Sequence, residues 1–162
     1  MIVTIIGLGL IGGSIAIDLK KRGFASKIIG VDNDNLHAKT AKNIGIIDVI
    51  EDLESGVKQA DLVVLAIPVD ATHTVLPRIL DLTNGQVITD VCSTKNDICE
   101  LIKDHAKRKN FVATHPMAGT EYSGPWAAVS HLFDGKSTFI CNREESSEEA
   151  LRIVEDMYGT LN

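Results

Sequence analysis

Residues 112–124, VATHPMAGTEYSG, gather polar side chains in a short stretch that is rich in glycine and proline. Glycine and proline suffice for a surface turn, but this stretch also contains His115, Thr120 and Glu121. A histidine side chain has an unperturbed pKa of about 6.5, so its imidazole suits proton transfer near neutral pH. We therefore predict that this loop lines a site of chemistry. The alternative is that His115, which precedes a proline, only caps a strand.

A second stretch, GLGLIG at residues 7–12, has the glycine spacing of a dinucleotide-binding turn. It follows an apolar run, precedes a helical stretch, and is followed 20 residues after its last glycine by Asp32. In such a turn Gly7 permits the tight bend, Gly9 lets the backbone approach the pyrophosphate, and Gly12 allows close packing of helix on strand. Free N–H groups at the start of the helix bind the phosphates. The predicted cofactor contacts are Gly7, Gly9, Leu10, Ile11, Gly12, Asp32, Ile67, Pro68 and Ser93.

The acid at the end of the second strand predicts which dinucleotide binds. Asp32 can accept hydrogen bonds from the ribose hydroxyls and repels a 2′-phosphate. No arginine lies between residues 33 and 42 to bind such a phosphate, although Lys39 and Lys42 do lie there. NAD is therefore predicted rather than NADP. The alternative is a glycine-rich turn without a ligand.

The order of apolar runs and helical stretches predicts the scaffold that holds these residues. Strands alternating with helices indicate an α/β fold, a Rossmann-type, doubly wound and mostly parallel sheet, in one NAD-binding domain over residues 1–162. Ligands of such sheets bind at the carboxyl ends of the strands, so the loop at His115 is expected to face the nicotinamide. Strands are expected at residues 2–6, 27–32, 49–50, 62–67, 86–90, 111–114 and 137–141, and helices near 10–22, 36–44, 54–59, 71–81, 95–109, 146–158 and within 123–132.

Composition narrows the class of protein. The formal net charge is −6 and the pI is near 5.3, and the basic run at residues 107–109 is expected to be a solvated helix end. Nucleic acid is therefore not an expected partner. The three cysteines form no CxxC pair, so no metal site is predicted, and no apolar run reaches the ~18 residues of a membrane span. A cytoplasmic location in a reducing compartment is predicted.

Four stretches together resemble the prephenate dehydrogenases, which form one family with the arogenate dehydrogenases. They are GLGLIGGS (7–14), LAIPVD (65–70), DVCSTK (90–95) and, most specifically, HPMAGTEYSG (115–124). The resemblance implies an NAD-dependent oxidative decarboxylation of prephenate to 4-hydroxyphenylpyruvate, a step of tyrosine biosynthesis. It implies that hydride leaves the ring carbon that bears the hydroxyl, and that loss of carbon dioxide then makes the ring aromatic.

The resemblance also implies catalytic and substrate-binding roles for individual residues. His115 would hydrogen-bond the ring hydroxyl and take its proton, while Ser93 would assist at the same hydroxyl or orient the nicotinamide. Glu121 would line the mouth of the pocket, and Thr120 and Ser123 would bind substrate or shape the loop. Two simpler interpretations stay open: Ser93 as the N-cap of the helix that follows it, and Glu121 as a solvated loop acid.

The resemblance further implies a helical domain that dimerises and completes the substrate pocket, so the full-length family member is expected to be a homodimer. That domain is absent from these 162 residues. Prephenate carries two carboxylates, which suit arginine, but none of the five arginines lies in the motif loops. We therefore expect NAD binding with little turnover of prephenate. The alternatives are an arogenate dehydrogenase, another Rossmann-branch dehydrogenase that uses a lysine from a helical domain, and a non-catalytic NAD(H)-sensing module.

Overall fold

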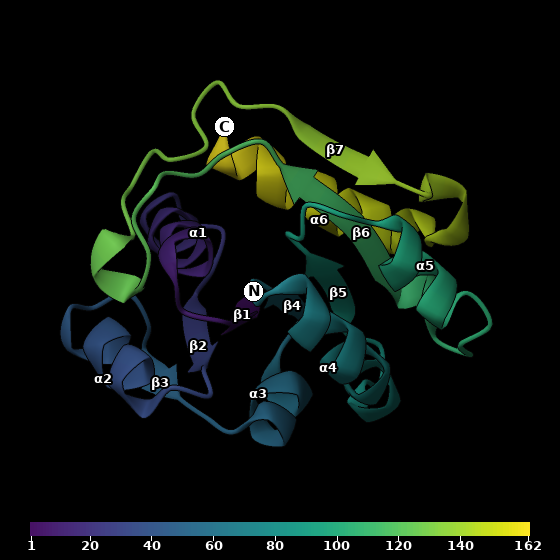
Figure 1. Cartoon of the computed structure of the whole chain (residues 1–162), viewed down its shortest axis with the longest axis horizontal. Helices are drawn as coiled ribbons and strands as arrows, with labels where there is room; N and C mark the ends of the chain where they lie inside the picture. Colours follow the sequence, from purple (N-terminus) through teal and green to yellow (C-terminus); the bar gives the residue numbers. More distant parts are fainter.

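A seven-stranded sheet runs through the computed structural model, which describes residues 1–162 (Figure 1). The strand order is β3-β2-β1-β4-β5-β6-β7. Neighbouring strands pair in parallel except for β7, which is antiparallel to β6 at the sheet's edge. The strands are β1 (Ile2–Ile6), β2 (Lys27–Val31), β3 (Val49–Ile50), β4 (Leu62–Leu65), β5 (Val87–Asp90), β6 (Phe111–Pro116) and β7 (Thr138–Cys141).

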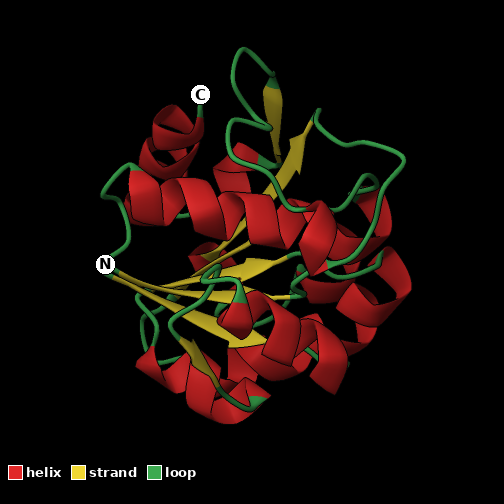
Figure 2. Cartoon of the chain, turned by 90° about the vertical axis from the view of Figure 1, so that its left-hand side faces the viewer, coloured by secondary structure: helices red, strands yellow, loops and turns green.

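Helices cover both faces of this sheet, as Figure 2 shows. The connections between parallel strands require such crossovers, and a sheet covered on both sides is built from continuously apolar strands. The strands β4 and β5 are buried at every position. The helices are α1 (Leu10–Lys21), α2 (Asn35–Asn43), α3 (Leu53–Gln59), α4 (Val69–Leu82), α5 (Asn96–Ile102) and α6 (Glu148–Leu161), and three single 3₁₀ turns are η1 (Arg108–Asn110), η2 (Pro125–Ala127) and η3 (Arg143–Glu145).

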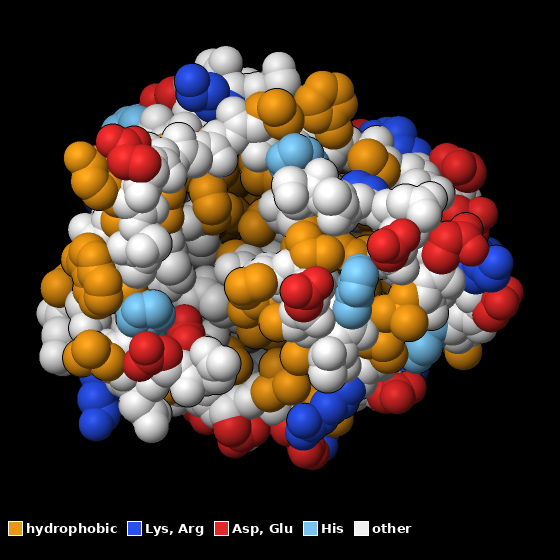
Figure 3. Space-filling view, viewed as in Figure 1, with side chains coloured by type: hydrophobic (Ala, Val, Ile, Leu, Met, Phe, Trp, Pro, Cys, Tyr) orange, Lys and Arg blue, Asp and Glu red, His pale blue; other side chains and the backbone are white.

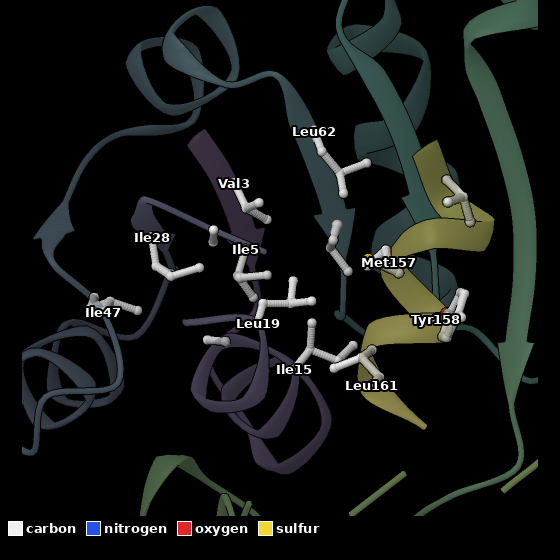
Figure 4. Close-up of a cluster of buried hydrophobic side chains, with 14 of the residues drawn as sticks. Val3, Ile5, Ile15, Leu19, Ile28, Ile47, Leu62, Met157, Tyr158 and Leu161 are labelled. Atoms are coloured by element: carbon white, nitrogen blue, oxygen red, sulfur yellow. The ribbon is translucent and has the colours of Figure 1, made fainter. Parts of the chain in front are cut away.

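Two hydrophobic cores lie on the two faces of the sheet. One core of 22 buried residues joins the strands to α1, α2 and α6, and Figure 4 shows Ile15 and Leu19 of α1 meeting Met157 and Leu161 of α6 over it. The other core, of 16 buried residues, lies under α3, α4 and α5. The sheet thus forms the middle of three layers, which confirms the predicted doubly wound α/β fold. None of the helices has the length and apolar character that crossing a membrane requires.

The sheet grows in two directions from β1, and this point matters for binding. The strands β2 and β3 follow on one side of β1, whereas β4, β5 and β6 follow on the other. Helices therefore diverge to opposite faces between β1 and β4, which leaves a crevice outside the carboxyl ends of these strands. The turn at residues 7–12 leaves β1 at this crevice.

The predicted helix at residues 95–109 is wrong in its second half. The helix α5 ends at Ile102, and the chain then turns through 103–107 into η1. Contacts with the end of α4 hold this bend: Lys107 Nζ donates to the carbonyl oxygens of Asp81 (2.9 Å) and Thr83 (2.5 Å). Arg108 was expected to be solvated but is buried, and its guanidinium donates a hydrogen bond to the Phe111 carbonyl oxygen (2.8 Å).

The stretch from residue 117 to residue 137 contains no α-helix, although one was expected within 123–132. Only the single turn η2 forms there. Phe133 is buried and anchors this stretch. Trp126 is exposed, and its ring makes an edge-to-face contact with His37 (ring centroids 5.5 Å apart). The expected strand at residues 62–67 ends at Leu65, because the next residues turn into α4.

Candidate cofactor and catalytic site

The glycine turn after β1 is fixed by its own backbone. Gly7 has φ +95°, and a Cβ at this position would lie 2.4 Å from the Ala66 carbonyl oxygen. A Cβ at Gly12 would lie 2.0 Å from the Gly7 carbonyl oxygen. Real Cβ atoms do not approach oxygen so closely, so both positions require glycine for the fold itself.

Gly9 differs from the other two glycines of the motif. No heavy atom lies within 4 Å of where its Cβ would be, and its φ of −75° is open to any residue. The fold therefore does not require glycine here. Gly9 is the N-cap of α1, whose first N–H groups, on Leu10 and Ile11, have no partner within the helix. A ligand that approaches these N–H groups would meet a side chain at residue 9.

Asp32 follows β2 and holds the glycine turn in place. Its carboxylate accepts hydrogen bonds from the backbone N–H groups of Leu8 (2.8 Å) and Asp34 (2.9 Å), and only 8% of its side chain is exposed. Each carboxylate oxygen can accept two hydrogen bonds. Asp32 can therefore accept a further hydrogen bond from a ligand hydroxyl while it fixes the turn.

A hollow of about 470 Å³ opens beside Asp32. Its size lies in the range of small-molecule sites, and Figure 3 shows that this face of the molecule is hollowed near its middle. The lining is apolar apart from three carboxylates and one amide, and it includes neither lysine nor arginine. The lining residues are Ile6, Gly7, Val31, Asp32, Asn33, Glu51, Asp52, Leu53, Ile67, Pro68, Ala71 and Val75. The structure thus brings together Gly7, Asp32, Ile67 and Pro68.

Ser93 lies three residues after the end of β5, whereas His115 lies within the neighbouring strand β6 and pairs with Phe139 of β7. The expected strand at residues 111–114 therefore extends to Pro116, because β7 continues the pairing. Asp90, the last residue of β5, pairs in register with Ala113 of β6, so both side chains belong to the same sheet edge. Ser93 is exposed and His115 is half-buried. The N-cap of α5 is Lys95, without a side-chain cap, so the interpretation of Ser93 as an N-cap is wrong.

The remaining predicted site residues lie in the exposed part of the loop. Thr120, Glu121 and Ser123 are all exposed. Thr120 Oγ1 accepts a hydrogen bond from the Tyr122 N–H (3.2 Å), which shapes the turn. Glu121 and Ser123 border a shallow hollow with Trp126, outside the one beside Asp32.

Cys92, next to Ser93, is a packing residue. Burial raises the pKa of its thiol to about 11 despite an opposing hydrogen bond with Thr72. The thiol is therefore protonated and unreactive at neutral pH.

Two buried carboxylates were missed at the sequence level, and both hold loops of the site. Asp18 is buried on α1, where it accepts hydrogen bonds from Ser130 Oγ (2.5 Å) and the His131 N–H (2.8 Å). One turn earlier, Ser14 Oγ accepts from the Val129 N–H (3.0 Å). The sequence contained a signal for this pair: Ser14 and Asp18 are polar residues in a largely apolar helical stretch. They are four positions apart, so their side chains lie on the same face of the helix.

The second missed carboxylate is Asp90, at the end of β5. It is completely buried and forms an ion pair with Lys95, whose side chain is only 10% exposed. The sequence signal for this ion pair was an acid at the end of an apolar run, followed five residues later by a lysine.

Comparison with known proteins agrees with this geometry. Residues 15–162 match the family model described as prephenate dehydrogenase, nucleotide-binding domain. Prephenate dehydrogenase of Lactococcus lactis is 37% identical over 154 residues, which cover 93% of this chain and 43% of that protein. Prephenate dehydrogenase of Bacillus subtilis is 35% identical over 99% of this chain and 44% of its own length. The chain thus spans less than half the length of these curated relatives.

Solved structures give the same result. Prephenate dehydrogenase from Aquifex aeolicus, in complex with hydroxyphenyl propionate and NAD+, superposes with a TM-score of 0.85 at 28% identity, over 100% of this chain and 57% of that one. Arogenate dehydrogenase of Synechocystis superposes with a TM-score of 0.89 at 27% identity, over 99% of this chain and 57% of that one. The seven-stranded sheet, the glycine turn and the match over residues 15–162 together show that the chain belongs to the prephenate dehydrogenase family, as its nucleotide-binding domain.

Proposed function

We propose that this chain binds NAD and forms the cofactor-binding part of a dehydrogenase that converts prephenate to 4-hydroxyphenylpyruvate. One observation carries the proposal: the glycine turn, the hollow beside Asp32 and His115 all lie at the carboxyl ends of parallel strands. Family membership and the NAD+ complex of the Aquifex aeolicus relative support the choice of cofactor.

The dinucleotide would lie across the crevice at β1. Its pyrophosphate meets the free N–H groups of Leu10 and Ile11 over Gly9, where the helix dipole favours negative charge. Its adenosine occupies the hollow, with the ribose hydroxyls donating to Asp32. Ile67 and Pro68 form an apolar wall of that hollow.

The charge of the hollow favours NAD over NADP. A 2′-phosphate would approach three carboxylates, those of Asp32, Glu51 and Asp52, and the lining offers no cation to compensate them. Repulsion between like charges and the cost of desolvating the phosphate both oppose NADP. Lys39 and Lys42 do not line the hollow.

His115 would perform the proton transfer of the reaction. Bound NAD supplies the acceptor for the hydride that leaves the hydroxyl-bearing ring carbon. His115 would accept the proton of that hydroxyl as the carbonyl forms. The ring carboxylate would leave as carbon dioxide, the electrons of the broken C–C bond would complete the aromatic ring, and the resulting phenolate oxygen would take the proton back from His115. The half-buried imidazole is accessible to a substrate that covers the loop, and imidazole is the side chain most often used for proton transfer near neutral pH.

The other proposed contacts follow from exposure and position. Ser93 is exposed on the strand end next to that of His115 and would hydrogen-bond the same hydroxyl or the nicotinamide amide. Glu121, Thr120 and Ser123 would line the mouth of the substrate pocket. Because all three are exposed in this chain, their role requires substrate or further protein to cover them.

The arginines support the expectation of low turnover. Arg22 is paired with Asp134, Arg143 with Glu155, and Arg108 is buried beside Phe111. No arginine lines the hollow beside Asp32 or the one beside Glu121. The two carboxylates of prephenate therefore lack a bidentate partner here.

The test begins with calorimetric titration of the chain with NAD and with NADP, followed by fluorescence assays of NADH formation from prephenate and from arogenate. We expect NAD to bind at least tenfold more tightly than NADP and NADH formation to be slow. Any turnover should fall about 100-fold or more in His115→Asn. Equal affinity for NADP would overturn the cofactor assignment, and unchanged turnover in His115→Asn would overturn the role of that histidine.

The same titration separates the enzyme from a sensing module. Substrate and cofactor that meet in one site change each other's affinity, and the two effects must be equal. We expect prephenate to alter the affinity for NAD. An affinity for NAD that is the same with and without saturating prephenate, together with no turnover, would favour the sensing module.

A further inference from the structure

Asp90 joins the two segments that carry Ser93 and His115. One oxygen of its carboxylate accepts from the Cys92 N–H (3.0 Å), and the other accepts from the Thr114 N–H (3.2 Å). Cys92 immediately precedes Ser93, and Thr114 immediately precedes His115. A single buried carboxylate therefore fixes the backbone just before each of the two candidate site residues.

Asp90 and His115 also lie on the same face of the sheet. Asp90 is in register with Ala113, and side chains alternate along a strand, so Ala113 and His115 share a face. The strand spacing and the rise per residue put the Cβ atoms of Asp90 and His115 roughly 8 Å apart. Charge on the carboxylate acts on the imidazole at this separation, because the region between them is largely buried.

Lys95 neutralises the buried carboxylate. Its Nζ donates to the same oxygen of Asp90 that binds the Cys92 N–H. An unpaired charge at a fully buried position would be strongly destabilising, so the pair is retained as a unit. On the other face of the sheet Thr114 is fixed as well, since its hydroxyl meets the hydroxyl of Tyr158 from α6 (2.7 Å).

We propose that Asp90 and Lys95 form a positioning pair that holds Ser93 and His115 in one geometry and sets the electrostatic environment of the His115 ring. Neither residue needs to touch substrate or cofactor. The inference rests on the proposed roles of Ser93 and His115. It adds two charged residues that support the site from behind: Asp90 at the end of β5 and Lys95 in the connection between β5 and α5.

The test uses nuclear magnetic resonance of this chain without ligand. The variants are Lys95→Met, Lys95→Arg, Asp90→Asn and the double variant, and the signals are the ring resonances of His115 as pH is varied. With Lys95→Met the uncompensated carboxylate should raise the midpoint of the ring titration by on the order of 0.5 to 1 unit. Asp90→Asn, which leaves the cation alone, should lower it. Lys95→Arg and the double variant should both titrate near the wild type.

Amide hydrogen exchange provides a second readout, and a surface ion pair provides the control. Asp90→Asn replaces one of the two carboxylate oxygens by a donor, so exchange of at least one of the Cys92 and Thr114 amides should increase about tenfold. Lys103→Met removes a cation from the exposed pair with Glu100 and should change neither readout. If Lys95→Met lowers the thermal midpoint while the His115 titration stays in place, the pair is merely structural and the proposal is wrong.

These outcomes are independent of the cofactor titration. Failure of NAD to bind would overturn the proposed function, whereas a charge-dependent titration of His115 would still be observed. If one of the two single variants does not fold, the other decides, because Lys95→Met and Asp90→Asn change the charge beside His115 in opposite directions. A His115 titration that stays at the wild-type midpoint in the single variant that folds would contradict the proposal.

Discussion

The hollow beside Asp32 and the loop from residue 115 to residue 136 are built on opposite principles. Around the hollow the backbone itself sets the geometry: Gly7 and Gly12 leave no space for a side chain, and Asp32 binds two backbone N–H groups. After the last two residues of β6, this loop contains no regular element other than η2, and side chains from elsewhere hold it.

This difference separates what the chain completes alone from what it leaves open. The domain itself supplies the residues that line the hollow. The loop instead exposes Met117, Tyr122 and Trp126, each more than half exposed, beside the candidate substrate contacts. A scaffold fixed by its backbone suits the proposed dinucleotide site. A loop pinned by a few side chains suits a surface that substrate or further protein covers.

The largest expected effect is on the backbone-defined region. In Gly12→Ala the added methyl group would collide with the Gly7 carbonyl oxygen, so the free energy of unfolding should fall by about 3 kcal/mol or more. Chemical denaturation measures this loss. Gly159→Ala, in a helix with open space around residue 159, is the matched control and should be neutral or slightly stabilising. Equal effects of the two substitutions would show that the turn is not as tight as described.

A smaller effect, restricted to the ligand, is expected for Gly9→Ala. The free energy of unfolding should be unchanged, since the methyl group meets no atom of the protein. The affinity for NAD should fall about 100-fold, because the methyl group lies where the pyrophosphate approaches the start of α1. Calorimetry and thermal unfolding of the same sample separate the two quantities. Wild-type affinity in this variant would place the pyrophosphate elsewhere.

Asp18→Ala tests the side-chain anchors of the loop. Ser130 and the His131 N–H would lose a buried acceptor, so the free energy of unfolding should fall by about 1 to 3 kcal/mol. Amide exchange and limited proteolysis should locate the change between residues 127 and 135. Affinity for NAD should remain within about threefold of the wild type. A large loss of NAD affinity would mean that the loop and the hollow beside Asp32 are energetically coupled.

The smallest effect is expected at the exposed tip of the loop. Glu121→Gln should change the free energy of unfolding by less than about 0.5 kcal/mol, because the side chain is exposed and surface substitutions seldom cost more. NAD affinity should not change either. Only substrate-dependent measurements should respond. A clear loss of stability would assign Glu121 to the scaffold rather than to the pocket mouth.

Sequence reasoning predicted the glycine turn and the position of Asp32 at the end of the second strand. The glycine spacing and Asp32 specify a local geometry, and apolar strands alternating with helices specify the sheet that presents it. These features depend on residues that are close together in the sequence, so they can be recognised from one sequence alone.

The side-chain anchors were not predicted, because they join residues far apart in the sequence. Asp18 meets Ser130 and His131 over more than a hundred residues, and Asp90 meets the Thr114 N–H across two strands. The end of the predicted helix at 95–109 failed for the same reason, since contacts of Lys107 with the end of α4 override the helical preference of the local sequence. The positions of Thr120, Glu121 and Ser123 relative to a substrate depend on groups that cover the loop.

The most direct test of the account compares the ring titration of His115 when the protein is saturated with NAD+ and with NADH. The two ligands share the same phosphates, but only the oxidised nicotinamide ring carries a positive charge. If His115 faces the nicotinamide, NAD+ should lower the midpoint of its titration relative to NADH by on the order of 0.5 to 1 unit, while the distant His105 titrates identically in both complexes. Identical titration of His115 in the two complexes would contradict the central claim that this loop and the hollow beside Asp32 serve one bound dinucleotide.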